Sequence, residues 1–301
     1  MVIKWILAVI LALILWSFLE RKLLKVTEYT IHTDKNGQIP EGLSIVLLAD
    51  LHNNTFGKRN QRLVKKINSL KPDLVAVAGD LITKQQPCIP GNAYDLLEKL
   101  AGTYPVYYSY GNHEQHLAQL NQTEFSENSP EADDRRVKYE AFIKFRRTLE
   151  AKGVQFLDNS STVYSKNNSR IRITGISIDW KYYNKTRVIP MSNTYLEKIA
   201  GKSNQKEYQL LLAHNPIYFK SYIHWGADLI LSGHLHGGLI RLPLMGGIIS
   251  PQYRIFPKYD SGVFTEEKRS MVVSKGLGSH SVMMRLFNRP ELVFIRVKPS
   301  K

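Results

Sequence analysis

The chain has 301 residues, of which 43% are hydrophobic and 22% are charged, and its net charge is +15. These fractions are typical of a globular protein and exclude global disorder, while the length allows one large domain or two small ones. The positive charge favours anionic partners such as phosphates, nucleic acid or acidic lipids, but charge alone identifies none of them.

The first predicted element is a membrane anchor at residues 1–25. Residues 5–19 form an uncharged apolar run, which Val2 and Ile3 extend towards the ~20 residues that a spanning helix needs. A secretory signal peptide is the main alternative, but no small-residue cleavage pattern follows the run. A buried core helix fits less well, because a linker follows. We therefore expect a single-pass anchor in the cell membrane, and cations on both sides of the run leave its orientation open.

After a linker and entry strand at residues 26–43, we expect residues 44–301 to form one domain. Its first half has a βα rhythm. The expected strands are Ser44–Ala49, Asp73–Ala78 and Pro105–Tyr110, and the expected helices lie near residues 59–70 and 93–100. Because these strands are apolar throughout rather than alternating, they are typical of a sheet that is covered on both faces.

The second half begins with a long acidic loop at residues 123–134 and a helix near residues 136–150. It is richer in strands, which we expect at residues 170–176, 209–213, 228–232, 271–274 and 292–297. The simplest architecture is an α/β fold in which two mixed sheets pack together with helices outside, in four α-β-β-α layers. One transmembrane helix precedes this domain.

Polar side chains that bind metals follow the predicted strands. Those after the first three strands are Asp50, His52, Asp80, Asn112 and His113, and those after two later strands are His214, His234 and His236. Open α/β sheets place their sites at the carboxyl ends of strands, so these residues should meet. The single cysteine, Cys88, excludes a cysteine-rich metal cluster.

The spacing of these residues has a physical reason. Residues i and i+2 of an extended chain point the same way, so Asp50 with His52, and His234 with His236, can each direct two groups into one pocket. Oxygen and imidazole ligands together suit Mn, Fe, Zn or Co. Each motif alone could be an ordinary turn. Their repetition at successive strand ends favours a metal centre.

The motifs together resemble those of the calcineurin-like metallophosphoesterase superfamily. They are Asp50-x-His52, Gly79-Asp80, Gly111-Asn112-His113-Glu114, His214 and Gly233-His234-x-His236. The resemblance covers Ser44 to the carboxyl terminus. Segments near that end, such as residues 256–259 and 288–291, look like the membrane-anchored or exported bacterial branch. That branch includes phosphodiesterases and enzymes similar to UDP-2,3-diacylglucosamine hydrolases.

The resemblance implies two divalent metal ions and hydrolysis of a phosphodiester or pyrophosphate bond by a hydroxide that bridges them. One ion would be held by Asp50, His52 and His236, and the other by Asn112, His214 and His234, with Asp80 shared by both. His113 would act outside the metal shell as a general acid for the leaving oxygen. Two positions depart from the family pattern, Thr83 in place of an aspartate that orients this histidine, and Leu239 in place of a glutamine.

The substrate is less well defined by the sequence. The stretch 239–256, which follows two predicted ligands, is apolar. An ordinary core connection is its simplest interpretation, but a rim that contacts acyl chains or the membrane would favour an amphipathic or lipid-linked phosphate ester. A phosphomonoester, a nucleotide or a nucleic-acid phosphodiester are alternatives, as is a non-catalytic scaffold. No specific nucleic-acid partner is predicted, because the chain lacks an array of aromatic and basic residues for stacking.

Overall fold

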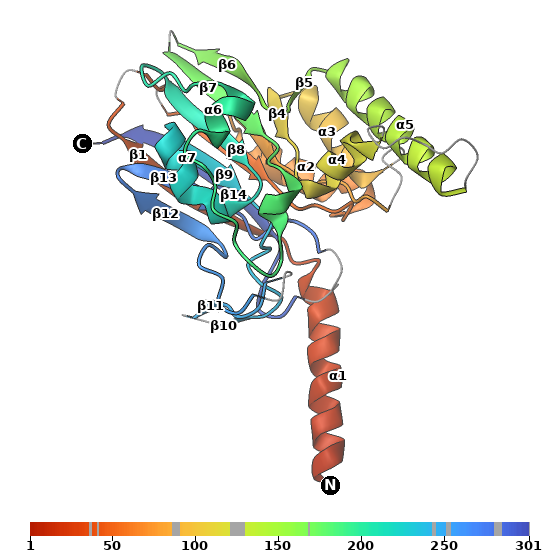
Figure 1. Cartoon of the computed structure of the whole chain (residues 1–301). Helices are drawn as coiled ribbons and strands as arrows, with labels where there is room; N and C mark the ends of the chain where they lie inside the picture. The colour runs from red at the N-terminus through yellow and green to blue at the C-terminus, as the bar shows by residue number, and fades with distance from the viewer. Residues whose placement is uncertain are drawn as a thin grey trace.

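The computed structural model describes residues 1–35, 38–40, 42–85, 91–120, 130–167, 169–242, 245–250, 254–279 and 285–300. Two six-stranded mixed sheets pack face to face with helices on their outer faces, and helix α1 (Val2–Glu20) projects away from this body (Figure 1). This arrangement is the predicted four-layer α-β-β-α fold preceded by an apolar helix. Cys88 lies outside the described residues.

The first sheet has the strand order β1-β14-β2-β3-β4-β5. Strands β2 to β5 are parallel, β14 is antiparallel to β2, and β1 pairs in parallel with β14. The strands are β1 (Lys25–Thr33), β2 (Ser44–Leu48), β3 (Leu74–Ala78), β4 (Val106–Ser109), β5 (Val154–Leu157) and β14 (Glu291–Pro299).

The second sheet has the order β12-β13-β9-β8-β7-β6, with parallel strands at its centre and an antiparallel strand at each edge. Its strands are β6 (Ser160–Lys166), β7 (Ser169–Ile176), β8 (Tyr208–Ala213), β9 (Leu229–Ser232), β12 (Gly262–Glu266) and β13 (Arg269–Val273). A separate hairpin pairs β10 (Arg241–Leu242) with β11 (Gly246–Gly247).

The apolar strands are buried on both faces. One hydrophobic cluster lies between the two sheets, and one lies between each sheet and its helices. Alternate residues of β2 face opposite ways, so that Val46 packs under the helices while Ile45 packs between the sheets. Helices α2 (Gln61–Leu70), α3 (Asn92–Ala101) and α5 (Pro130–Glu150) cover the first sheet. Helices α6 (Tyr195–Ala200) and α7 (Phe219–Trp225) cover the second sheet.

Helix α1 leaves the body beside β10 and β11 (Figure 1). Among the described residues it is the only helix whose length and composition would allow it to cross a membrane. Residues 1–16 are all exposed, whereas Ser17 and Glu20 in its last turns are buried against the body. The sheet follows at once, because β1 begins at Lys25 and pairs with β14 along its whole length.

The carboxyl-terminal part of the predicted acidic loop is helical. Helix α5 begins at Pro130, so Asp133 and Asp134 lie in its first turns, where they pair with Arg136 and Lys138. Acidic residues are favourable at a helix amino terminus because they interact with the helix dipole, and pairs at i,i+3 and i,i+4 add to this. The prediction of a loop at residues 130–134 was therefore wrong, and residues 121–129 lie outside the described residues.

Candidate metal centre

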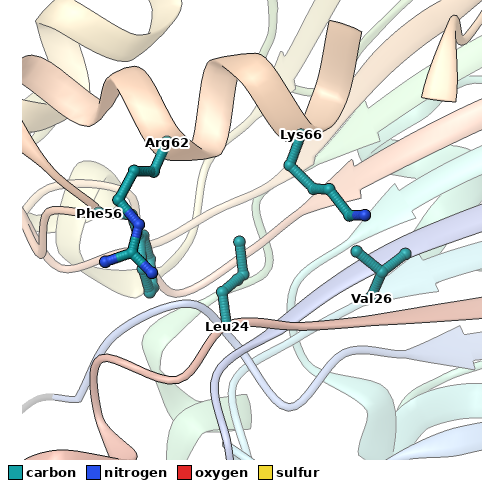
Figure 2. Close-up of a pocket in the computed structure, with 5 residues that line it drawn as sticks. All are labelled: Leu24, Val26, Phe56, Arg62 and Lys66. Atoms are coloured by element: carbon teal, nitrogen blue, oxygen red, sulfur yellow. The ribbon is translucent and has the colours of Figure 1, made fainter. Parts of the chain in front are cut away.

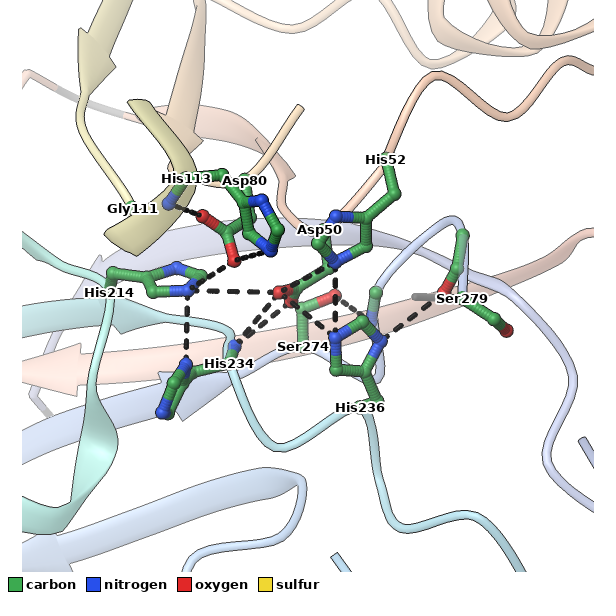
Figure 3. A network of polar contacts seen from close by, with 12 residues as sticks. Asp50, His52, Asp80, Gly111, His113, His214, His234, His236, Ser274 and Ser279 are labelled. Atoms are coloured by element: carbon green, nitrogen blue, oxygen red, sulfur yellow. Dashed lines mark hydrogen bonds and ion pairs between the residues drawn. The ribbon is translucent and has the colours of Figure 1, made fainter. Parts of the chain in front are cut away.

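All eight predicted site residues follow strands within a few residues. Figure 3 shows seven of them, all but Asn112, gathered in one network of polar contacts. Asp50 and His52 follow β2, Asp80 follows β3, and helix α4 (Asn112–Ala118) begins directly after β4. In the second sheet, His214 follows β8, and His234 and His236 follow β9. The carboxyl ends of parallel strands therefore bring these groups together from both sheets.

The paired motifs reach the site through tight turns rather than through extended chain. Asp50, His52, Asp80, His234 and His236 all have φ between 46° and 74°. Residues other than glycine rarely adopt this left-handed conformation, and such residues cluster at functional sites because surrounding contacts must hold them. The paired side chains do converge, as expected, but the expectation that extended backbone would direct them was wrong. Turns direct them instead.

The ends of β3 and β4 touch through two glycines. A Cβ atom on Gly79 would overlap the backbone of Gly111, and a Cβ atom on Gly111 would overlap the Asp80 carboxylate. Gly79 also has φ of 84°, which only glycine adopts readily. These two positions therefore require glycine if the loop that carries Asp80 is to lie against the start of α4.

Asp50, His52 and His236 form one group of potential ligands, whose nearest nitrogen and oxygen atoms all lie within 4.8 Å of one another. His52 Nε2 lies 3.2 Å from His236 Nε2, which in turn lies 3.4 Å from Asp50 Oδ1. Asp50 is fully buried, and both its carboxylate oxygens accept a hydrogen bond from the His234 main-chain N–H.

Asp80, His214 and His234 form a second group of the same dimensions. Asp80 Oδ2 lies 3.1 Å from His214 Nε2, and His214 Nε2 lies 3.2 Å from His234 Nδ1. Asp80 also lies within 4.8 Å of His52 and His113, so its carboxylate stands between the two groups. This position suits a ligand that two ions share.

Asn112, the first residue of α4, offers a further oxygen ligand. Its Oδ1 atom is buried and accepts no hydrogen bond from the residues that the structure describes. A buried amide oxygen without a donor costs free energy unless water or an ion satisfies it. Two carboxylates, one amide oxygen and four imidazoles therefore fit two divalent ions, and they match the preferences of Mn, Fe, Zn and Co.

Main-chain carbonyls fix two of the imidazole rings. His214 donates from Nδ1 to the Ala78 carbonyl at 2.6 Å, and His236 donates from Nδ1 to the Gly278 carbonyl at 3.2 Å. In the neutral form of each ring, Nε2 therefore carries the lone pair and faces the cluster. Metal-binding histidines usually have such a hydrogen bond on the second nitrogen, because it sets the tautomer and the orientation of the ring.

Burial and neighbouring charges shift the pKa values of the clustered residues in different directions. Burial raises the pKa of Asp50 to about 7, although the charge of His214 opposes this. Burial also disfavours the charge on Asp80, but the neighbouring histidines outweigh it and hold the pKa of this carboxyl well below its usual value. Burial opposes the charge on His214, but Asp80 and Asp50 together with the hydrogen bond to Ala78 outweigh it and raise the pKa to about 10. Burial lowers the pKa of His236 to about 3.

His113 is oriented by main chain rather than by a carboxylate. The Lys84 N–H donates a hydrogen bond to His113 Nδ1 at 3.1 Å, so a neutral ring carries its proton on Nε2. Nε2 lies 4.0 Å from Asp80 Oδ2. The Thr83 hydroxyl is buried and makes no hydrogen bond within the described part of the chain. The main-chain N–H of Lys84, next to Thr83, thus orients the ring in place of the aspartate that the resemblance implied, and it does so as a donor rather than as an acceptor. Geometry alone would also let His113 bind an ion beside His52 and Asp80.

Glu114 was quoted in the motif but received no role from the sequence. It is fully buried, and its Oε2 accepts hydrogen bonds from the main-chain N–H groups of Asp80 and Gly111, at 2.8 and 3.0 Å. Its Oε1 accepts from the Tyr108 hydroxyl at 2.6 Å. This carboxylate ties the Asp80 loop to α4. Burial, reinforced by the charge of Asp80, raises the pKa of Glu114 to about 7.

Tyr183 is a further residue that the sequence did not indicate. It lies in a short 3₁₀ helix, Trp180–Tyr183, that follows β7. Its ring meets that of His234 edge-on, with the centroids 5.2 Å apart. Position after a strand end was again the available signal, but a tyrosine is not a typical metal ligand. It can instead form an aromatic wall of the site.

A separate hollow of about 190 Å³ lies between α2 and the start of β1, outside the ligand cluster (Figure 2). Leu24, Val26 and Phe56 form its apolar floor, and Arg62 and Lys66 of α2 border it. Neither cation has a carboxylate within 4.0 Å among the described residues. Arg62 and Lys66 therefore place positive charge close to the base of α1.

Comparison with known proteins finds phosphoesterases over most of the chain. The profile of the calcineurin-like phosphoesterase family matches residues 43–238. The chain is 25% identical over 293 residues to the Bacillus subtilis "Uncharacterized metallophosphoesterase YkuE", covering 93% of this chain and 88% of that protein. It is 27% identical over 257 residues to the Escherichia coli "Phosphodiesterase YaeI", covering 84% and 81% of the two chains.

A Danio rerio "Transmembrane protein with metallophosphoesterase domain" is 27% identical over 281 residues, which are 91% of this chain and 57% of that protein. Among solved structures, the phosphopantetheinyl hydrolase of Mycobacterium tuberculosis aligns with a TM-score of 0.43 and 11% identity, covering 82% of this chain and 96% of that one.

Proposed function

The chain belongs to the calcineurin-like phosphoesterase family and is a metal-dependent hydrolase of phosphate esters, and from this premise we propose that it cleaves a phosphodiester or pyrophosphate bond. The observation that carries the proposal is the convergence of two buried ligand groups on one shared carboxylate, Asp80. The phosphodiesterase among its relatives supports the choice of a diester.

Asp50, His52 and His236 would hold one ion, and Asn112, His214 and His234 the other, with Asp80 shared. Two ions there would polarise the phosphoryl oxygens and lower the pKa of a bound water. The buried, hydrogen-bonded ligands exclude bulk solvent, and the tight turns keep them in place before substrate arrives.

His113 would contact the substrate rather than an ion. Because the Lys84 N–H occupies Nδ1, the ring can offer only its Nε2 proton to the site. We propose that this proton is donated towards the leaving oxygen, either as a hydrogen bond or by transfer. The His113 main-chain N–H donates to Asp80 Oδ1 at 2.9 Å, whereas the ring Nε2 lies 4.0 Å from Asp80 Oδ2.

The test combines metal content with hydrolysis of a chromogenic diester, bis(p-nitrophenyl) phosphate. We expect the metal-reconstituted protein to hold about two ions per chain and to hydrolyse this diester. Asp80→Asn should lose both ion retention and hydrolysis, because the shared charge is removed. Asp158→Asn, which changes an exposed aspartate outside the cluster, serves as the matched control. Saturation at one ion, or full activity after complete metal removal, would contradict the proposal.

We further propose that the substrate is amphipathic or lipid-linked and that α1 anchors the enzyme in the cell membrane. The rim of the site, defined as residues 239–242, 245–250 and 254–256, supports this. Met245, Ile255 and Phe256 of the rim are exposed by 60%, 71% and 53%. Exposed apolar side chains that cluster beside a site are typical of a surface that meets lipid or another apolar partner.

The rim is also joined to the base of α1. The Arg241 N–H donates to the Leu286 carbonyl at 3.0 Å, and the Leu286 N–H donates to the Leu239 carbonyl at 3.3 Å. The neighbouring Phe287 is 54% exposed, and its N–H donates to Glu20 in α1. The hydrogen-bonded path from anchor to rim supports a site entrance close to the membrane surface.

A further inference from the structure

The last two turns of α1 form specific hydrogen bonds with a distant segment of the chain, residues 285–287. Ser17 Oγ accepts from the Arg285 N–H at 2.9 Å, and Glu20 Oε2 accepts from the Phe287 N–H at 2.7 Å. Ser17 and Glu20 are only 4% and 2% exposed, although residues 1–16 are all exposed. A helix that served only as a tether would not need buried polar contacts of this kind.

The Arg285 side chain continues the connection inward. Its guanidinium is buried and donates to the carbonyls of Lys275, Gly278 and Asn288, at 2.8, 2.6 and 3.1 Å, and to Ser279 Oγ at 3.0 Å. No carboxylate lies within 4.0 Å of it among the described residues. A buried guanidinium held mainly by main-chain carbonyls fixes the path of that main chain, because its donors form a rigid planar fork.

The chain that Arg285 fixes is the support of two proposed metal ligands. The Gly278 carbonyl, which accepts from Arg285, also accepts the hydrogen bond from His236 Nδ1. The Gly278 N–H donates to the Asp50 carbonyl at 2.6 Å. Asn288 adds a second contact, because its Nδ2 donates to the His236 carbonyl at 2.7 Å. His236 and Asp50 thus depend on residues that the anchor holds.

We propose that the final turns of α1 act as a positioning element for the ion site of Asp50, His52 and His236, with Arg285 as the positioning residue between them. This inference rests on the proposed ligand assignment. The other ion site has a different support, since His214 is oriented by the Ala78 carbonyl inside the sheet. The connection reaches the other site through the hydrogen bonds from the His234 N–H to Asp50, so loss of the anchor contacts weakens the site of Asp50, His52 and His236 more than the other.

The experiment measures the two stepwise metal affinities of the full chain in nanodiscs, by equilibrium dialysis against chelator-buffered zinc. Glu20→Ala should weaken one affinity by up to about tenfold and change the other less, because Glu20 acts through residues 285–287, whereas loss of a hydrogen bond made directly to a ligand costs ~10–100-fold. Glu20→Gln keeps a carbonyl that can accept from Phe287 and should restore most of the affinity. Glu28→Ala, an exposed glutamate on β1, is the matched control and should change neither affinity.

Hydrogen–deuterium exchange provides a second readout. In Glu20→Ala, and independently in Ser17→Ala, exchange should accelerate in residues 275–279 and 285–289 but not in β8. Unchanged affinities in both variants, or an equal fall of both affinities together with the melting temperature, would overturn the proposal. Asp50→Asn distinguishes a wrong ligand assignment from a wrong connection between α1 and the site. If it keeps both ions at full affinity, the ligand assignment is wrong; if it loses one ion while the α1 variants lose none, only the connection is wrong.

Discussion

At the residue scale, the chemistry of the site depends on which nitrogen of each imidazole faces inward. Carbonyl groups set this for His214 and His236, and an N–H group sets the opposite arrangement for His113. In their neutral forms, the first two rings therefore present a lone pair to the cluster, and the third presents a proton. The same residue type thus has two roles, and its hydrogen-bond partner decides which one.

His113→Ala tests this distinction. We expect the variant to keep both ions and to lose turnover by about 10²–10⁴-fold on diesters with poor leaving groups. The loss should be much smaller for p-nitrophenolate, which leaves without a proton. Metal content and rates on both substrate types give the answer. Loss of an ion would make His113 a ligand, and equal losses on both substrates would mean that it positions the phosphate instead.

Metal uptake should depend on pH. Ions bind the deprotonated ligands, so below its pKa each group holds a proton that the ion must displace. Without an ion, His214 holds its extra proton below its pKa of about 10, and Asp50 holds one below its pKa of about 7. Affinity should therefore rise as pH increases from 6 to 9, with proton release. Calorimetry in buffers of different ionisation enthalpy measures this release, and a pH-independent affinity would contradict the assigned ligands.

At the element scale, the strand-end rule predicted that the eight site residues would meet because parallel strands share one carboxyl edge, and seven of the eight do form adjoining groups of potential ligands. The central strands were predictable because a strand that is buried on both faces has apolar residues at nearly every position. Edge strands β6 and β12 escaped prediction, because their residues are largely exposed or half-buried and carry no such run. The sequence also did not predict a role for Arg285, because that role depends on folded contacts such as the one with Ser17, which is far away in the sequence.

Gly79→Ala tests the contact between the ends of β3 and β4. The new Cβ would overlap Gly111, and alanine is strained at the positive φ, so we expect a loss of about 2–5 kcal/mol in stability together with weaker metal retention. Gly102→Ala is the control, since a Cβ atom there would lie 3.8 Å from its nearest neighbour and the φ of −70° suits alanine. Thermal unfolding and metal analysis distinguish the two, and a stable, metal-replete Gly79→Ala would contradict the packing argument.

At the scale of the whole molecule, the burial of Ser17 limits how far the body can stand from a membrane. Residues 1–16 of α1 are exposed, whereas Ser17 and Glu20, which follow directly in the same helix, are buried against the body, so no linker separates the exposed part of α1 from the body. If α1 spans the bilayer, the parts of the body at its base must therefore reach into the interface. These parts include Phe287 and the rim, and the cations Arg62 and Lys66 border a hollow that begins at Leu24.

The double variant Ile255→Ser, Phe256→Ser tests this arrangement. Each side chain would contribute about 1–2 kcal/mol if buried in the interface, so hydrolysis of a diester embedded in vesicles should fall by about tenfold or more. Hydrolysis of the soluble chromogenic diester should not change, because the rim residues lie outside the ligand cluster. Val137→Ser, which alters an exposed valine on α5 away from the anchor, should affect neither rate (Figure 1). Equal losses on both substrates would mean that the rim supports the site structurally, and no loss on vesicles would remove the argument for a lipid-linked substrate.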